Sequence, residues 1–135
     1  MGILLFANSG KEIEEKLVDL INAFPQKHTI EICHSIFELS ERFHQPRQDV
    51  VTMVFLVGSR EDILSLLLLK KLFFDIPLIL ILPDREKETA RLGFKMIPPF
   101  VSYEDGNFEE IQSVMTNMLK QYDLRFGNNK HMVTT

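Results

Sequence analysis

Short runs of apolar residues alternate along the chain with stretches in which apolar residues recur at helical spacing. The runs at 3–7 and 76–82 are almost uninterrupted, which is typical of strands buried on both faces of a sheet. Residues 28–34 alternate between polar and apolar and indicate a half-exposed strand at a sheet edge. Residues 50–57 are the most β-rich run and predict a central strand. A weak fifth strand is predicted at 94–97, before a pair of prolines.

The segments between these strands predict five helices. In the first, the apolar residues form one stripe, and Ser35 supplies an N-cap for the second. The expected ranges are about 12–24, 36–43, 61–74, 85–92, where Gly93 ends the helix, and 107–126. The alternation predicts one α/β domain at 1–126, a single five-stranded parallel sheet with helices on both faces. Residues 127–135 are a polar tail that we expect to fray.

Composition and charge exclude several classes of function. A net charge of −4 on 135 residues argues against nucleic acid, which requires a basic surface. Cys33 is the single cysteine, so an intrachain disulfide and a thiolate metal cluster are excluded, and a reducing cytoplasm is the natural setting. No apolar run approaches the roughly 18 residues of a membrane span. We therefore expect a cytoplasmic domain with no metal, cofactor, nucleic acid or membrane among its ligands.

Three local patterns, in this order and spacing, resemble one known family. Residues 3–6 lead into a polar turn, 49–54 form the approach to a central strand end, and 76–82 are followed by the proline-rich segment 97–100. From about residue 3 to residue 124, the chain is thereby similar to the CheY-like receiver domains of response regulators. The resemblance implies the strand order 2-1-3-4-5 and a site at the carboxyl ends of the strands.

The same resemblance implies that the residues of receiver phosphorylation are replaced. Ala7 and Asn8 stand where receivers carry the acidic pair that binds Mg²⁺, and Val54 stands at the phosphorylated aspartate. Leu82 replaces the switch threonine or serine, and Pro98 replaces the lysine. Phosphoryl transfer of this kind needs a carboxylate nucleophile and oxygen ligands for the metal. The sequence therefore indicates a degenerate pseudo-receiver, a non-catalytic signalling module rather than an enzyme.

Two surfaces are candidates for a protein partner or for self-association, including a homodimer. The third predicted helix is apolar around its circumference, with Leu68, Leu69 and Leu72 as its expected exposed members. The second surface, on the fourth helix, fifth strand and fifth helix, carries Arg91, Lys95 and Tyr103. Its mixed charges also describe an ordinary solvated helix.

Two alternative functions belong to other classes. The first is a phosphoryl-accepting receiver in a two-component phosphorelay, in which an acid such as Asp62 or Asp84 takes the place of the missing aspartate. The second is a small-anion or ligand sensor at the strand ends, where hydroxyl and guanidinium groups can hold an anion. The residues of this possible anion pocket are Ser9, Ser59, Arg60 and Arg85.

Overall fold

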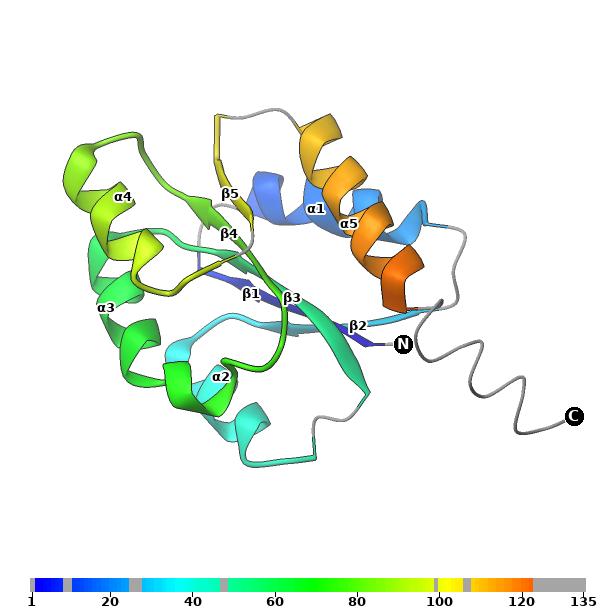
Figure 1. Cartoon of the computed structure of the whole chain (residues 1–135), viewed down its shortest axis with the longest axis horizontal. Coiled ribbons are helices and arrows are strands. Elements are labelled where there is room, and N and C mark those ends of the chain that lie inside the picture. The colour runs from blue at the N-terminus through cyan, green and yellow to red at the C-terminus, as the bar shows by residue number, and fades with distance from the viewer. Residues whose placement is uncertain are drawn as a thin grey trace, which may run out of the picture.

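The structure, a computed structural model, describes residues 2–8, 11–24, 28–46, 49–98, 100–105 and 108–122. Within these residues one five-stranded parallel sheet has the order β2-β1-β3-β4-β5 (Figure 1), which confirms the predicted strand order and the position of β2 at an edge. The strands are β1 (Gly2–Ala7), β2 (Thr29–Cys33), β3 (Val50–Leu56), β4 (Leu78–Leu82) and β5 (Phe100–Tyr103). The tail 127–135 lies outside the described residues.

The helices cover both faces of the sheet, as the alternating pattern predicts. Two of them, α1 and α5, lie side by side on one face, and α2, α3 and α4 cover the other (Figure 1). Their bounds are α1 (Lys11–Asn22), α2 (Ile36–Phe43), α3 (Arg60–Leu68), the 3₁₀ turn η1 (Lys70–Leu72), α4 (Lys87–Phe94) and α5 (Phe108–Tyr122). Ser35 caps α2 as expected, because its side-chain oxygen accepts a hydrogen bond from the backbone N–H of Glu38 at 3.1 Å.

The strands are apolar on both sides because each side faces a layer of helices. Along β1, Leu4 and Phe6 pack into the cluster beneath α2, α3 and α4, whereas Ile3 and Leu5 pack into the cluster beneath α1 and α5. All four side chains are buried. Among the described helices, none is long and apolar enough to cross a membrane.

The predicted fifth strand at 94–97 is wrong, and β5 begins at Phe100 instead. The backbone N–H groups of Lys95, Met96 and Ile97 donate to the carbonyls of Leu92, Gly93 and Phe94 respectively. These local hydrogen bonds complete the last turn of α4. The same N–H groups therefore do not pair with a neighbouring strand of the sheet. The apolar residues of 94–97 therefore belong to a helix terminus.

Gly93 lies inside α4 rather than ending it, which corrects a second boundary. A Cβ atom at this position would lie 3.1 Å from methyl groups of both Leu80 and Leu82. Glycine therefore allows the last turn of α4 to pack closely on β4, and its backbone has no positive φ angle of the kind that ends a helix.

The third predicted helix, at 61–74, is also shorter than expected. α3 ends at Leu68, and the chain continues as a 3₁₀ turn that delivers Phe73 into the core. The Phe73 ring lies 5.3 Å from the ring centroids of both Phe43 and Phe55. Phe73, after the end of α3, thus joins an aromatic cluster with side chains from α2 and β3.

This packing predicts that alanine substitutions at two adjacent phenylalanines differ greatly in their effect on stability. Phe73 is 2% exposed and Phe74 is 73% exposed. We expect Phe73→Ala to lower the free energy of unfolding by about 3–5 kcal/mol because it empties the aromatic cluster. Phe74→Ala is the matched control and should change it by no more than about 0.5 kcal/mol. Urea denaturation followed by circular dichroism measures both values, and equal losses in the two variants would contradict the placement of Phe73.

Candidate functional site

Ligands of open parallel α/β sheets bind at the carboxyl ends of the strands, so the site is built from that edge. The strand register pairs Ala7 of β1 with Leu56 of β3, and Leu82 of β4 with Tyr103 of β5. These four residues therefore mark the C-terminal edge of the sheet, formed by the carboxyl ends of the strands. In receivers this edge carries the phosphorylation machinery.

Val54 does not lie at this edge. It is fully buried within β3 and is paired with Leu5, two residues before the position that faces Ala7. The residues at the end of β3 are Leu56 and Val57, both 0% exposed. The register therefore places the position equivalent to the nucleophile further along β3 than predicted, at Leu56 or Val57. The side chains of these two residues also lack an oxygen.

Because β5 begins at Phe100, Lys95 does not lie in the fifth strand and Pro98 does not follow it. Lys95 is the C-cap of α4, and Pro98 belongs to the connection between α4 and β5. The residue at the end of β5, in register with Leu82, is Tyr103. Its ring is covered by the guanidinium group of Arg85, 4.2 Å from the ring centroid.

Arg85 is held on Tyr103 by a carboxylate from the segment after β5. Its Nε donates to both carboxylate oxygens of Asp105, at 3.1 and 3.2 Å. This hydrogen bond is the main reason that the pKa of Arg85 is raised. The cation at the end of β4 thus has an internal anionic partner.

A carboxylate does reach the end of β1, but it comes from α3. The side-chain amide of Asn8 donates to both oxygens of Asp62, at 3.0 and 2.9 Å, and the backbone N–H of Gly58 donates to Oδ2 at 3.2 Å. The N–H of Asp62 in turn donates to Oγ of Ser59, the N-cap of α3. Asp62 thus extends the capping of α3 by Ser59 and ties the start of that helix to the ends of β1 and β3.

Gly58 allows this close approach between strand ends. A Cβ atom on Gly58 would lie 2.3 Å from the backbone oxygen of Asn8. No side chain fits there without moving the backbone, so glycine is a steric requirement of the link.

The residues of the predicted anion pocket have separate partners. Ser59 caps α3, and the guanidinium group of Arg60 donates to Oγ1 of Thr89 at 2.9 Å and to the carboxylate of Glu86. Arg85 is directed to Asp105, and Ser9 lies outside the described residues. The two guanidinium groups thus bind different carboxylates, and a shared anion site stays a prediction.

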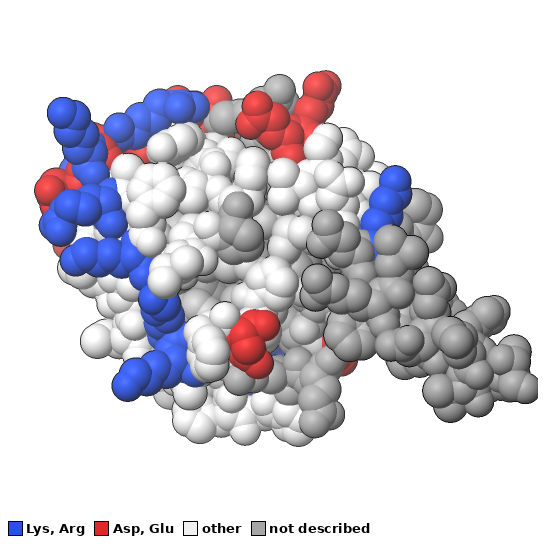
Figure 2. Space-filling view, in the orientation of Figure 1, with Lys and Arg blue, Asp and Glu red and all other residues white. Residues whose placement is uncertain are grey.

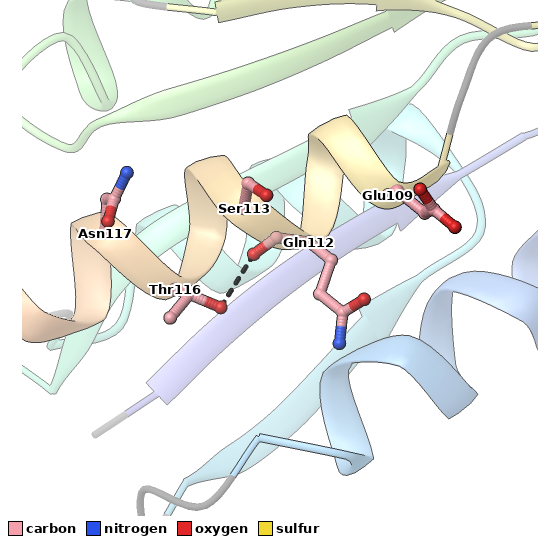
Figure 3. A pocket seen from close by; sticks show the side chains of 5 residues that line it. All are labelled: Glu109, Gln112, Ser113, Thr116 and Asn117. Carbon is pink, nitrogen blue, oxygen red and sulfur yellow. Dashed lines mark hydrogen bonds between the residues drawn. The ribbon is translucent and has the colours of Figure 1, made fainter.

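Two further observations concern metal binding and surface depressions among the described residues. No group of three or more His, Cys, Asp and Glu side chains in the described part of the chain could hold a metal ion. A shallow depression follows the outer side of α5 (Figure 3) and is lined by Glu109, Gln112, Ser113, Thr116 and Asn117. Thr116 donates to the carbonyl oxygen of Gln112 at 2.7 Å. These side chains are those of a solvated helix surface.

The predicted interaction residues differ in how exposed they are. Leu68 is 87% exposed, as expected, but Leu69 and Leu72 are partly buried against the core. The expectation of exposure is wrong for these two because the 3₁₀ turn rotates them inward. Arg91 is exposed and bonded to Glu88 at 2.8 Å, which lowers the pKa of that carboxyl.

Sequence reasoning missed several exposed apolar side chains near the ends of helices. Phe37, Phe74, Phe94 and Ile97 are all more than half exposed. The sequence pattern predicts a strand at 94–97, which conceals the exposure of Phe94 and Ile97. Their exposure follows from the helix-terminal hydrogen bonds of this segment, which the hydrophobic pattern does not record.

Solved structures that share this fold include two receiver domains. A response regulator receiver protein from Pseudoalteromonas atlantica matches with a TM-score of 0.68 at 18% identity, covering 90% of this chain and 95% of that chain. A response regulator receiver domain protein from Clostridium thermocellum matches with a TM-score of 0.70 at 12% identity, covering 93% and 98%. At these identities the likeness establishes the receiver fold alone. Compared by sequence, the chain matches no protein-family model and no curated protein.

The link between Asn8 and Asp62 predicts a pH-dependent loss of stability in one variant. Asn8→Asp replaces the amide donor by a carboxylate that faces Asp62, so the pKa values of the pair rise in the folded state. The cost, about 1–2 kcal/mol for these partly exposed groups, should be present at neutral pH and relieved as pH falls towards the ordinary carboxyl pKa of about 4. Urea denaturation at several pH values measures it.

The reciprocal swap is the control. Asn8→Asp combined with Asp62→Asn restores one amide and one carboxylate, and should regain most of the lost free energy of unfolding at neutral pH. If the swap were as unstable as Asn8→Asp alone, the contact between these two side chains would not be the cause.

Proposed function

We propose that this domain is a non-catalytic signalling module of the receiver type, which acts by binding a protein and is not switched by aspartyl phosphorylation. The observation that carries the proposal is the chemistry of the strand ends. Ala7 and Asn8 follow β1, and Leu56 and Val57 lie at the end of β3. A phosphoryl-accepting receiver needs carboxylates at both strand ends, one set for the metal and one as the nucleophile.

Burial at the edge supports the proposal. Leu56, Val57 and Leu82 are each 0% exposed and pack into the two core clusters beneath the helices, so none of them presents a polar group at the strand ends. An acyl phosphate and its metal need oxygen ligands, which these side chains do not supply. The residue paired with Leu82 is Tyr103, whose face is taken by Arg85.

The two alternative acids have other contacts. Asp62 accepts hydrogen bonds from Asn8 and Gly58, and forming an acyl phosphate on either carboxylate oxygen would disturb the contact that the Asn8 amide makes with both of them. Asp84 accepts the backbone N–H of Glu86 at 2.9 Å, which holds it in the turn before α4. Both contacts favour a structural role for these carboxylates. A receiver fold without its usual acids can still signal by binding a partner through the surfaces of its helices.

The test is a titration with Mg²⁺ and beryllofluoride, an analogue of the aspartyl phosphate, followed by backbone amide NMR. We expect no saturable shift at the amides of Asn8, Val57, Gly58 or Asp84, because the carboxylates that the structure describes near the strand ends, those of Asp62, Asp84 and Asp105, already accept hydrogen bonds from other groups. A phosphorylatable receiver domain measured under the same conditions shows that the reagents are active.

Saturable shifts at these amides would contradict the proposal and return the protein to the phosphoryl-accepting class. Asp62→Asn and Asp84→Asn would then identify the acid, since the responsible substitution abolishes the shifts. Asp105→Asn is the matched control, because Asp105 pairs with Arg85 at the same edge.

A further inference from the structure

A hydrogen bond joins the ends of two helices on the face covered by α2, α3 and α4. Nζ of Lys70, in the turn after α3, donates to the carbonyl oxygen of Lys95, the C-cap of α4, at 3.0 Å. Leu68, Phe94 and Ile97 lie within two residues of this link along the chain. These five residues, Leu68, Lys70, Phe94, Lys95 and Ile97, are called the α3–α4 patch.

The apolar members of the patch face water. Leu68 is 87% exposed, Phe94 59% and Ile97 76%. Ile97 also has a φ angle of 51°, a conformation that is sterically unfavourable for a β-branched residue. The fold therefore holds Ile97 in a strained conformation without burying its side chain. Backbone strain of this kind clusters at active sites, ligand-binding segments and switch regions.

The charge of the patch is opposite to that of the chain. Lys70 and Lys95 belong to it, exposed Lys71 lies beside it, and none of the three has an ion pair with another described residue. Figure 2 shows Lys and Arg side chains in a band over α4 and the turn after α3. The whole chain carries a net charge of −4, so this basic band is a local departure.

We propose that the α3–α4 patch binds an acidic amphipathic segment of a partner protein, with carboxylates on the lysines and apolar side chains against Leu68, Phe94 and Ile97. The inference rests on the proposed function and specifies the partner's chemistry. Helical segments in grooves are recognised by apolar anchors about one turn apart, and opposite charge sets their orientation.

Two other occupants fit the observations less well. A second copy offers acidic residues on α1 and α5, but none of the large exposed apolar side chains among the described residues lies on those helices. An anionic membrane is typically held by clusters of about four to eight Lys or Arg. The patch and its border hold three lysines, Lys87 lies at the opposite end of α4, and Arg91 is already paired with Glu88.

The experiment selects binders from a displayed library of random peptides about 16 residues long, enough for roughly four helical turns. We expect the selected peptides to be rich in Asp and Glu with spaced Leu or Phe, and their amide NMR shifts on the protein to centre on the patch. The double variant Leu68→Ser, Phe94→Ser should weaken binding about tenfold or more, as loss of central apolar anchors does.

Matched variants separate the patch from general surface effects. Lys95→Glu should weaken binding several-fold, and added salt should reduce the wild-type affinity. Phe37→Ser removes an aromatic ring that is 73% exposed on α2, and Lys120→Glu reverses an exposed charge on α5. Both controls should leave the affinity within about twofold.

Several results would overturn the inference. They are selection of no peptide or only basic peptides, shifts that map to other helices, or equal affinity in the patch variants and the controls. Pelleting with phosphatidylserine vesicles that requires Phe94 would make the surface a membrane contact, and self-association abolished by Lys95→Glu would make it a contact between copies. Peptides that bind elsewhere leave the proposed function standing, whereas shifts with beryllofluoride would end it whatever the peptides do.

Discussion

The structure depends on one constraint, that a parallel sheet between two layers of helices must be apolar on both sides. β4 shows it most completely, since Leu78 to Leu82 are all buried and alternate between the two core clusters. In such a sheet, polar chemistry can enter only where the strands end. Here the burial continues to the strand ends at Leu56, Val57 and Leu82. The polar groups at that edge consequently come from the loops and helix starts, as Asp62 and Arg85 do.

The same constraint explains which parts of the fold were predictable. Short apolar runs identify β1, β3 and β4 because only strands buried on both faces need such runs in a chain of this size. Ser35 identifies the start of α2 because its capping hydrogen bond is local in sequence. Strand register is different, because it is set by pairing between distant segments. The prediction therefore chose Val54 where the pairing of Ala7 with Leu56 moves the edge by two residues.

The remaining errors come from helix ends. The mostly apolar segment 94–97 predicts a strand, yet the N–H groups of Lys95, Met96 and Ile97 bond three residues back along the chain. Leu69 and Leu72 are expected to be exposed, but α3 ends at Leu68 and both side chains pack against the core beside the turn η1. In both places a competition between local hydrogen bonding and core packing decides the outcome, and hydrophobic pattern alone does not record it. The exposed apolar side chains of the α3–α4 patch are a product of these two helix ends.

The strand ends and the α3–α4 patch are connected through α3 and α4. Asp62 fixes the start of α3 to β1, Arg60 joins it to Thr89 and Glu86 of the α4 region, and Lys70 ties the chain after α3 to the end of α4. In a domain that gains a phosphoryl group at the strand ends, a new charge could shift such a set of contacts. On the function proposed here no such charge arrives, so the contacts hold one arrangement of the two helices. Preorganisation lowers the entropic cost of binding, and signalling by this domain would then be controlled by the supply of its partner.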